Sequence, residues 1–231
     1  MKSKPTRFTL IAPVGGDIEA VYMGIREFPT EKIFLIHSGK DSPKTESFER
    51  ELQKFRIPLQ RIEVKGTALG GILRAFAQIK ATTSEEKLLV NVSSGDKNSA
   101  TATLAAAFVN GLKAFHVDGE RVVMFPVLKF SYYRLLPGKK LAVLRFLMDQ
   151  PECCSSLEDL AKRTGMSLPL VSYHINGNAK AEGLISLGLV EVQVAERGRT
   201  QVMLSEMGRL IVDGMMEIPA REAREFPGIK A

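Results

Sequence analysis

The chain has 231 residues, of which 45% are hydrophobic and 25% are charged, and its formal net charge is +6. These values are typical of a globular protein of one or two domains. No apolar run approaches the roughly 20 residues that span a bilayer. No signal-type apolar segment follows the charged start MKSKPTRF, so we expect a cytoplasmic protein without a membrane partner.

The excess positive charge lies in the first part of the chain. Residues 1–137 hold 20 Lys and Arg against 14 Asp and Glu, whereas residues 138–231 hold 12 of each kind. This distribution suggests that the first part meets an anionic ligand or surface.

The cysteines and histidines give no sign of metal chemistry. Cys153 and Cys154 are adjacent and are the only cysteines, so we expect packed or surface thiols without a disulfide or a zinc site. His37, His116 and His174 lie far apart in the sequence. We therefore expect no metal and no cofactor.

Strand and helix signals alternate along residues 1–136. Short apolar runs predict strands, and apolar residues spaced by three and four predict helices. The predicted strands are 7–13, 32–38, 59–64, 87–93, 113–117 and 121–130, and the predicted helices are 18–28, 45–55, 69–79 and 100–108. This alternation is typical of a Rossmann-like, doubly wound α/β domain with a mostly parallel sheet.

Polar loops that contain glycine follow three of these strands. Such sheets bind ligands at the carboxyl ends of their strands, where glycine permits close approach and helix-opening amides favour an anion. We expect a phosphate-bearing ligand, held by Val14, Gly15, Gly16 and Asp17, by His37, Ser38 and Gly39, and by Ser93, Ser94, Gly95, Asp96, Lys97 and Asn98. The alternative is that these residues only form tight turns. Neither GxGxxG nor GxxxxGK[ST] occurs, which argues against nicotinamide enzymes and P-loop NTPases.

Residues 137–231 predict a second domain, which begins at the break Leu136-Pro137-Gly138. Its predicted helices are 139–148, 157–164, 168–183 and 207–215, and its predicted strands are 188–192 and 201–204. Ser156 and Ser167 are expected to cap two of the helices, and Gly165 lies in the short turn between them. This order of elements, with a basic turn between the strands, is typical of a winged helix-turn-helix domain.

The helix after the short turn would read a DNA major groove, and the basic turn would contact phosphate or the minor groove. The predicted DNA-binding residues are Ser167, Ser172, Tyr173, His174 and Asn176 on the helix, and Arg197 and Arg199 on the turn. A winged helix that binds protein remains an alternative, because this domain has no net charge. The run Asn176-Gly177-Asn178 is poor helix sequence, so the helix can also kink or end there.

Several segments resemble a known family. The stretch LLVNVSSGDKNSATATLAAAF and the loop APVGGD resemble the two motifs of CARF domains, named for the CRISPR-associated Rossmann-like fold. The stretch LEDLAKRTGMSLPLVSYHI is similar to winged helices of the ArsR and MarR type. Together, residues 7–215 resemble the archaeal CARF–winged-helix transcriptional regulators.

The resemblance implies a homodimer that binds a cyclic oligoadenylate across its two-fold axis. By match of position, Gly15, Gly16 and Asp17 would line one edge, and Ser94 to Asn98 would surround phosphate and ribose. Some family members have Gly-Gly-Thr-Lys where this chain has Ser-Gly-Asp-Lys. Asp96 would therefore either weaken phosphate binding or bind a ribose hydroxyl.

The leading hypothesis is a transcriptional regulator rather than an enzyme. Its partners would be double-stranded DNA, a nucleotide second messenger and a second copy of the chain. One alternative is a ring nuclease, in which Ser93, Ser94, Lys97 or His37 positions a ribose 2′-hydroxyl for attack on the adjacent phosphate. Another is a winged-helix scaffold that binds protein.

Overall fold

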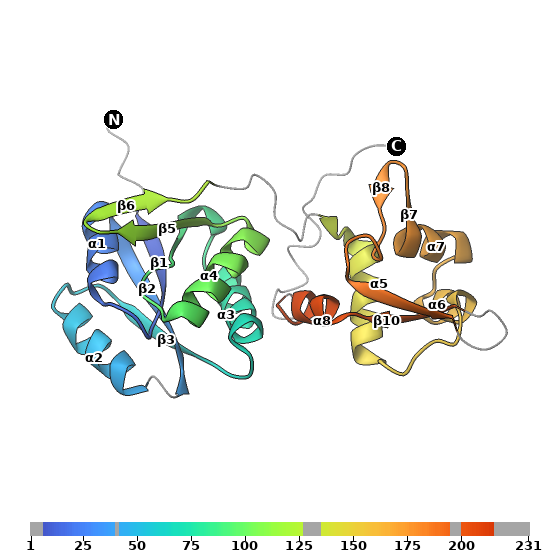
Figure 1. Cartoon of the computed structure of the whole chain (residues 1–231), viewed down its shortest axis with the longest axis horizontal. Coiled ribbons are helices and arrows are strands. Elements are labelled where there is room, and N and C mark those ends of the chain that lie inside the picture. The colour runs from blue at the N-terminus through green and yellow to red at the C-terminus, as the bar shows by residue number, and fades with distance from the viewer. Residues whose placement is uncertain (1–6, 40–41, 127–134, 195–199, 215–231) are drawn as a thin grey trace. The chain divides into compact units, whose positions relative to one another are not determined.

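The structure is a computed structural model that describes residues 7–39, 42–126, 135–194 and 200–214. The described residues divide into two compact units, the first ending at residue 126 and the second beginning at Leu135 (Figure 1). Each unit is described by itself below.

A six-stranded sheet forms the centre of the first unit. Its strands are β1 (Phe8–Pro13), β2 (Thr30–Ser38), β3 (Leu59–Val64), β4 (Leu88–Asn91), β5 (Lys113–Asp118) and β6 (Arg121–Met124). The strand order is β3-β2-β1-β4-β5-β6; all pairs are parallel except β5 with β6. The prediction of an α/β unit with a mostly parallel sheet is therefore confirmed.

Helices cover the sheet on both sides. They are α1 (Glu19–Glu27), α2 (Ser42–Gln53), α3 (Ala68–Thr82) and α4 (Lys97–Asn110), with a short 3-10 helix at Glu85–Lys87. Helices α3 and α4 pack against each other, and Figure 1 shows α1 and α2 across the sheet from them. Strand runs such as Leu10–Ala12 and Leu88–Val90 are buried, because both faces of the sheet are covered.

Most observed element ends differ from the predicted ones by a few residues, and two differences in the first unit concern where an element stops or starts. Strand β6 stops at Met124, whereas the sequence predicted a strand to residue 130. Phe125 still donates its amide to the carbonyl of Ala114, but the strand pattern does not continue, and residues 127–130 lie outside the described residues. Helix α2 begins at Ser42, ahead of the predicted start at residue 45.

Among the described residues, the second unit contains four helices and two antiparallel pairs of strands. Its helices are α5 (Gly138–Asp149), α6 (Leu157–Thr164), α7 (Leu168–Asn176) and α8 (Glu206–Asp213), and its strands are β7 (Gly177–Asn178), β8 (Ala181–Glu182), β9 (Val190–Val194) and β10 (Thr200–Leu204). Ser156 caps α6 through the amide of Asp159, as predicted. Gly165 ends α6 in the left-handed conformation, and Ser167 occupies the N-cap position of α7 without a side-chain bond.

Helix α7 is shorter than predicted, and the predicted extension to residue 183 is wrong. It ends at Asn176 because Gly177 has φ 75°, a left-handed backbone that leaves the helix. The chain then turns through the small β7–β8 hairpin. A Cβ on Gly177 would lie 2.4 Å from the Gly183 nitrogen, so this tight return requires glycine. The alternative of a helix end at Asn176-Gly177-Asn178 is the one observed.

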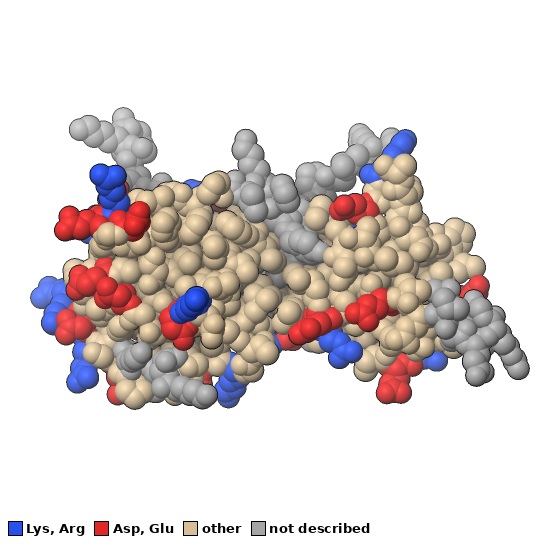
Figure 2. Space-filling view, in the orientation of Figure 1, with Lys and Arg blue, Asp and Glu red and all other residues tan. Residues whose placement is uncertain are grey.

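The surface in the view of Figure 2 carries charges of both signs. On each unit, lysine and arginine side chains among the described residues are interspersed with aspartate and glutamate. Within the part of the chain that the structure describes, none of the helices has the length and apolar character that a membrane span requires.

Candidate functional site: the switch point of the sheet

The first candidate site lies where β1 and β4 run side by side. From β1 the chain passes into α1, and from β4 it passes into α4, which lies across the sheet. The two loops therefore diverge at the carboxyl ends of neighbouring parallel strands. This topological switch point is where open α/β sheets bind ligands.

The β1–α1 and β4–α4 loops contact each other through glycine backbone. Gly15 and Gly95 form an isolated bridge, and the Gly16 amide donates to the Ser94 carbonyl at 3.0 Å. A Cβ on Gly16 would lie 2.4 Å from the Gly95 oxygen. Gly15 has φ 135°, which L side chains rarely adopt. The glycines that the sequence singled out thus permit the close approach of the two loops.

Asn91 and Ser93 anchor the β4–α4 loop to its neighbours. Asn91 is buried, and its side-chain Nδ2 donates to the Ala20 carbonyl in α1 at 2.8 Å. Its Oδ1 accepts from the backbone amide of Ser93 at 2.9 Å. The Ser93 hydroxyl accepts from the Val117 amide at 2.8 Å. Sequence reasoning did not select Asn91; a polar residue that ends a buried apolar strand was the available signal.

Aspartates occupy the N-termini of both helices at the switch point. Asp96 is the N-cap of α4 and accepts from the Ser99 amide at 2.7 Å. Asp17 accepts from the Glu19 amide at the start of α1 at 3.0 Å. Each carboxylate offsets the positive end of its helix dipole. Lys97, the first residue of α4, brings an exposed positive charge to the same place.

Ser94 lies beneath this rim with an unsatisfied hydroxyl. The residue is fully buried, and its Oγ has no hydrogen-bond partner among the described residues. Leaving a buried hydroxyl unpaired costs about 1–3 kcal/mol. Ser94 is thus a polar group beside the helix N-terminus whose hydrogen-bonding capacity the described part of the chain does not use.

The predicted ligand-binding residues fall into three groups by exposure. The exposed members are Gly16, Asp17, Gly39, Asp96, Lys97 and Asn98; the half-buried ones are Gly15, Ser38, Ser93 and Gly95; and the buried ones are Val14, His37 and Ser94. Val14 packs in the core, and its amide donates to the Ile36 carbonyl, so neither its side chain nor its amide faces a ligand. For Val14, the prediction of a ligand contact through these groups is wrong.

The third loop flanks the other two. Strand β2 lies on the far side of β1 from β4, so the carboxyl ends of β2 and β4 are about 10 Å apart at the usual strand spacing. His37 is buried, and its Nδ1 lies 3.1 Å from the Ser38 carbonyl oxygen. The fold therefore brings the first and last loops together and leaves His37 two strands from Ser93 and Lys97.

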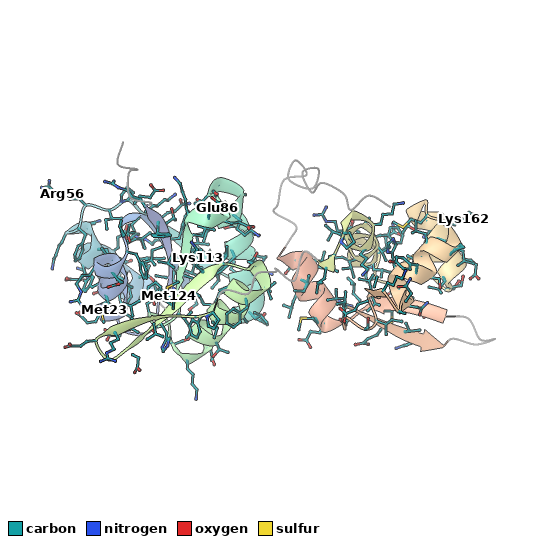
Figure 3. All side chains as sticks on the ribbon, turned by 90° about the horizontal axis from the view of Figure 1, so that it is seen from above. Met23, Arg56, Glu86, Lys113, Met124 and Lys162 are labelled. Carbon is teal, nitrogen blue, oxygen red and sulfur yellow. A yellow bond between two sulfur atoms is a disulfide. The ribbon has the colours of Figure 1, made fainter. Side chains whose placement is uncertain are left out.

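The opposite end of the sheet provides a reference surface. Lys113 begins β5 and Glu86 precedes β4, so both lie at the amino ends of the strands (labelled in Figure 3). Lys113 is exposed like Lys97 but lies at the amino ends of the strands, and Lys97 lies at their carboxyl ends. Replacing Lys113 is therefore a matched control for replacing Lys97 in a binding experiment.

The second candidate site is the outer surface of α6 and α7. The two helices pack together and are joined by Gly165-Met166-Ser167. Ser167, Tyr173 and Asn176 are exposed, whereas Ser172 is half-buried and its hydroxyl accepts from the Asn176 amide at 3.1 Å. Arg197 and Arg199 lie outside the described residues.

His174 does not belong to this exposed surface, so its assignment to DNA contact is wrong. It is 6% exposed, and neither ring nitrogen has a partner among the described residues. Val171, His174 and Ile175 form the buried stripe of α7, with the spacing of three and four that faces a core. Burial first, and then the charges of Lys140 and Lys139, lower the pKa of His174 from its ordinary 6.5.

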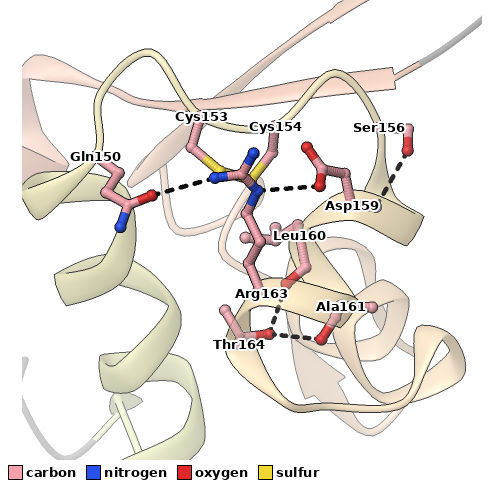
Figure 4. The surroundings of a disulfide bond; sticks show 9 residues. All are labelled: Gln150, Cys153, Cys154, Ser156, Asp159, Leu160, Ala161, Arg163 and Thr164. Carbon is pink, nitrogen blue, oxygen red and sulfur yellow. Dashed lines mark hydrogen bonds and ion pairs between the residues drawn. A yellow bond between two sulfur atoms is a disulfide. The ribbon is translucent and has the colours of Figure 1, made fainter.

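The cysteine prediction is also wrong, because Cys153 and Cys154 form a disulfide (Figure 4). Adjacent side chains in extended backbone point to opposite sides. Cys154 instead has φ 79°, a left-handed conformation that turns its side chain toward that of Cys153. The two sulfurs and a carboxylate oxygen of Asp159 lie within 4.8 Å of one another. Thiolates, not disulfide sulfurs, are the metal-binding form of cysteine.

Comparison with known proteins matches the first unit to a family. Residues 9–122 match the family model described as "HFX_2341_N:-like, N-terminal". None of the curated proteins matches the chain.

Solved structures include distant similarities. The chain is similar to Can2 from Sulfobacillus thermosulfidooxidans in complex with cyclic tetra-adenylate, with 11% identity, a TM-score of 0.43, and coverage of 90% of this chain and 62% of that one. It is similar to protein VC1899 from Vibrio cholerae, with 12% identity, a TM-score of 0.42, and coverage of 91% and 66%. The chain is also similar to a type III CRISPR defence DNA nuclease activated by cyclic oligoadenylate, with 16% identity and a TM-score of 0.43. The match covers 86% of this chain and 37% of that one. The chain thus spans less than two thirds of each.

Proposed function

We propose that the chain is a DNA-binding transcriptional regulator of the CARF–winged-helix type, whose first unit senses a nucleotide, a cyclic oligoadenylate. Two copies would form a homodimer, and each second unit would be a winged helix-turn-helix domain. The main observation in favour of this proposal is that the glycines of the β1–α1 and β4–α4 loops contact each other at the switch point, with Lys97 exposed beside them.

The charges at this rim favour a ligand with both phosphates and hydroxyls. Lys97 supplies an ammonium for a phosphate, whereas Asp17 and Asp96 supply carboxylates that accept hydrogen bonds from hydroxyls. A free anion without hydroxyls would meet two carboxylates and one lysine. A nucleotide offers both phosphate and ribose, and this agrees with the resemblance of the SSGDKN segment to the CARF motif.

The second unit supports the DNA-binding half of the proposal by its order of elements. Helices α6 and α7 are joined by a three-residue turn, and the β9–β10 hairpin follows. In this arrangement α7 enters the major groove with Ser167, Tyr173 and Asn176 exposed. Two copies would address half-sites about 34 Å apart.

Titration calorimetry with cyclic tetra-adenylate tests the sensing half. Replacing Lys97 with alanine removes one charge-assisted contact, worth about 1.5–3 kcal/mol, so we expect affinity to fall about 10- to 100-fold. Lys113→Ala changes a lysine at the amino ends of the strands, and this variant should bind cyclic tetra-adenylate like the parent. Equal binding by the Lys97 variant and the parent would remove Lys97 from the site.

Incubation of the protein with cyclic tetra-adenylate separates a sensor from a ring nuclease. Chromatography of the ligand after prolonged contact with the protein should return only the cyclic form. Accumulation of linear product at a rate that follows protein concentration would make the first unit an enzyme.

A gel shift with the DNA upstream of the chain's own gene tests the other half. Arg197→Ala and Arg199→Ala should weaken binding to all sequences and flatten its salt dependence, because phosphate contacts release counterions. Lys113→Ala serves again as a control in the first unit. If both arginine variants bind like the parent at every salt concentration, these residues do not contact DNA.

A further inference from the structure

The cysteine pair lies in a turn that the proposed function does not use. Cys153 and Cys154 are the only cysteines of the chain, and they are bonded to each other between α5 and α6. We name residues 150–156 the α5–α6 turn. Both cysteines are nearly buried, at 6% and 4% exposure, but both line a pocket of about 560 Å³. A pocket of this size accommodates a small molecule beside the sulfur atoms.

The backbone of this turn is unusual at the residue where the covalent bond forms. Cys154 is one of two non-glycine residues among the described ranges with positive φ, the other being Arg56. Side chains disfavour this conformation, so a residue holds it only when its surroundings impose it. The disulfide between neighbours is such a constraint, and reduction removes it.

Polar groups surround the sulfur atoms. Asp159 lies within 4.8 Å of both sulfurs by a carboxylate oxygen, and the Arg163 Nε lies 3.0 Å from Asp159 Oδ1 (Figure 4). The Arg163 guanidinium also reaches Gln150 Oε1 at 3.5 Å. These side chains line the same pocket as the cysteines. The Asp159 carboxylate beside the sulfurs disfavours the thiolate that leaves when a disulfide is attacked, and the Arg163 guanidinium paired with that carboxylate offsets the repulsion.

We propose that Cys153–Cys154 is a thiol–disulfide exchange site for a low-molecular-weight thiol. A thiolate enters the pocket and attacks one cysteine sulfur; the bond between the two cysteines breaks, and the other cysteine leaves as a thiolate. A second thiolate attacks the external sulfur of the mixed disulfide and releases the oxidised small-molecule disulfide. The protein gains two electrons and two protons, and two thiols become one disulfide.

Reduction should loosen the turn at the start of α6. Ser156 caps α6 two residues after Cys154, and Asp159 and Arg163 follow in the same helix. Without the covalent constraint, Cys154 is expected to leave its left-handed conformation. The amides of the α5–α6 turn and of the first turn of α6 should then exchange hydrogen several-fold faster.

Alkylation with iodoacetamide and intact mass measurement test the site on the native full chain. The protein should acquire no alkyl group when purified in air and two after incubation with reduced glutathione. Alkylation of both cysteines without reductant, or reduction only after denaturation, would overturn the proposal. Cys153→Ser leaves one thiol and should acquire a single glutathione from oxidised glutathione; failure to do so would also contradict an accessible exchange site.

Two further measurements separate exchange chemistry from a merely structural bond. Arg163→Gln should slow reduction by glutathione, whereas Lys162→Gln, an exposed neighbour on α6, should leave its rate unchanged. Hydrogen exchange of the oxidised and reduced proteins should differ in the α5–α6 turn and not in the first unit. Equal rates for both variants, or no difference in exchange, would refute the site as described.

Discussion

Replacing Gly16 with alanine tests the loop contact on which the candidate ligand site depends. The added Cβ would lie 2.4 Å from the Gly95 oxygen and 2.9 Å from the Gly95 carbonyl carbon. These atoms are backbone and cannot rotate away. Real Cβ contacts below 3.0 Å are essentially never seen, so the loops must separate by 0.6 Å or more. That shift would lengthen the 3.0 Å bond from the Gly16 amide to the Ser94 carbonyl to as much as about 3.6 Å, beyond hydrogen-bond range.

The expected cost combines a lost hydrogen bond with overpacking. The bond contributes about 1 kcal/mol, and forced displacement of packed structure costs about 1–3 kcal/mol. The sum of about 2–4 kcal/mol corresponds to a fall of about 5–15 °C in the Tm of the first unit. The variant should also lose affinity for cyclic tetra-adenylate, since the two loops would no longer meet.

Differential scanning calorimetry of the full chain measures this effect. Gly138→Ala is the control, because no described atom lies within 4 Å of its added Cβ and the residue is at the start of α5. Alanine there should leave the Tm unchanged or raise it slightly. A Gly16 variant as stable as the parent, with unchanged ligand affinity, would show that the loops do not touch as described.

Three other substitutions give defined outcomes. Asn91→Ala breaks the bonds to Ala20 and Ser93 and should cost about 2–4 kcal/mol in urea unfolding; a loss within experimental error would mean that Asn91 does not anchor the loop. Asp96→Ala removes the cap of α4 and should cost about 1 kcal/mol in the same assay, whereas Asp96→Asn should stay near the parent; equal losses would contradict the cap. For His174, burial lowers the pKa, so the unfolded chain takes up the proton first, and acidification below 6.5 destabilises the fold. Between pH 7.5 and 5.5 the parent should lose up to about 1.4 kcal/mol more stability than His174→Leu, and parallel pH profiles would refute this.

The sheet and its helices could be predicted because their signals are local. Apolar runs closed by glycine marked the parallel strands, and spacings of three and four marked the helices. The stripe Val171, His174, Ile175 carried the same signal, which places His174 inside the second unit although its side chain is polar. The Gly177 break was visible as poor helix sequence, yet its left-handed conformation depends on the return of Gly183 beside it.

The candidate site could be predicted only in part, because its contacts are long-range. The sequence located the glycine loops, but not that Gly15 meets Gly95 or that Asn91 bonds to Ala20, 71 residues away. It also gave no sign that Cys154 would turn its side chain toward Cys153. Those features depend on which strands become neighbours and on the backbone conformation of a single residue.

The two aspartates at the switch point indicate how charged a ligand the site tolerates. A phosphodiester carries one negative charge, whereas the triphosphate of a nucleotide concentrates several in one place. Asp96 caps α4, and the Asp17 carboxylate accepts from the Glu19 amide at the start of α1, so a dense polyphosphate meets repulsion where helix amides would otherwise attract it. The parent should therefore bind cyclic tetra-adenylate more tightly than ATP in titration calorimetry. The double variant Asp17→Asn, Asp96→Asn keeps the oxygens that accept from the helix amides but removes both charges. It should bind cyclic tetra-adenylate and ATP with more similar affinities than the parent does. An unchanged ratio of the two affinities would show that the carboxylates do not face the ligand.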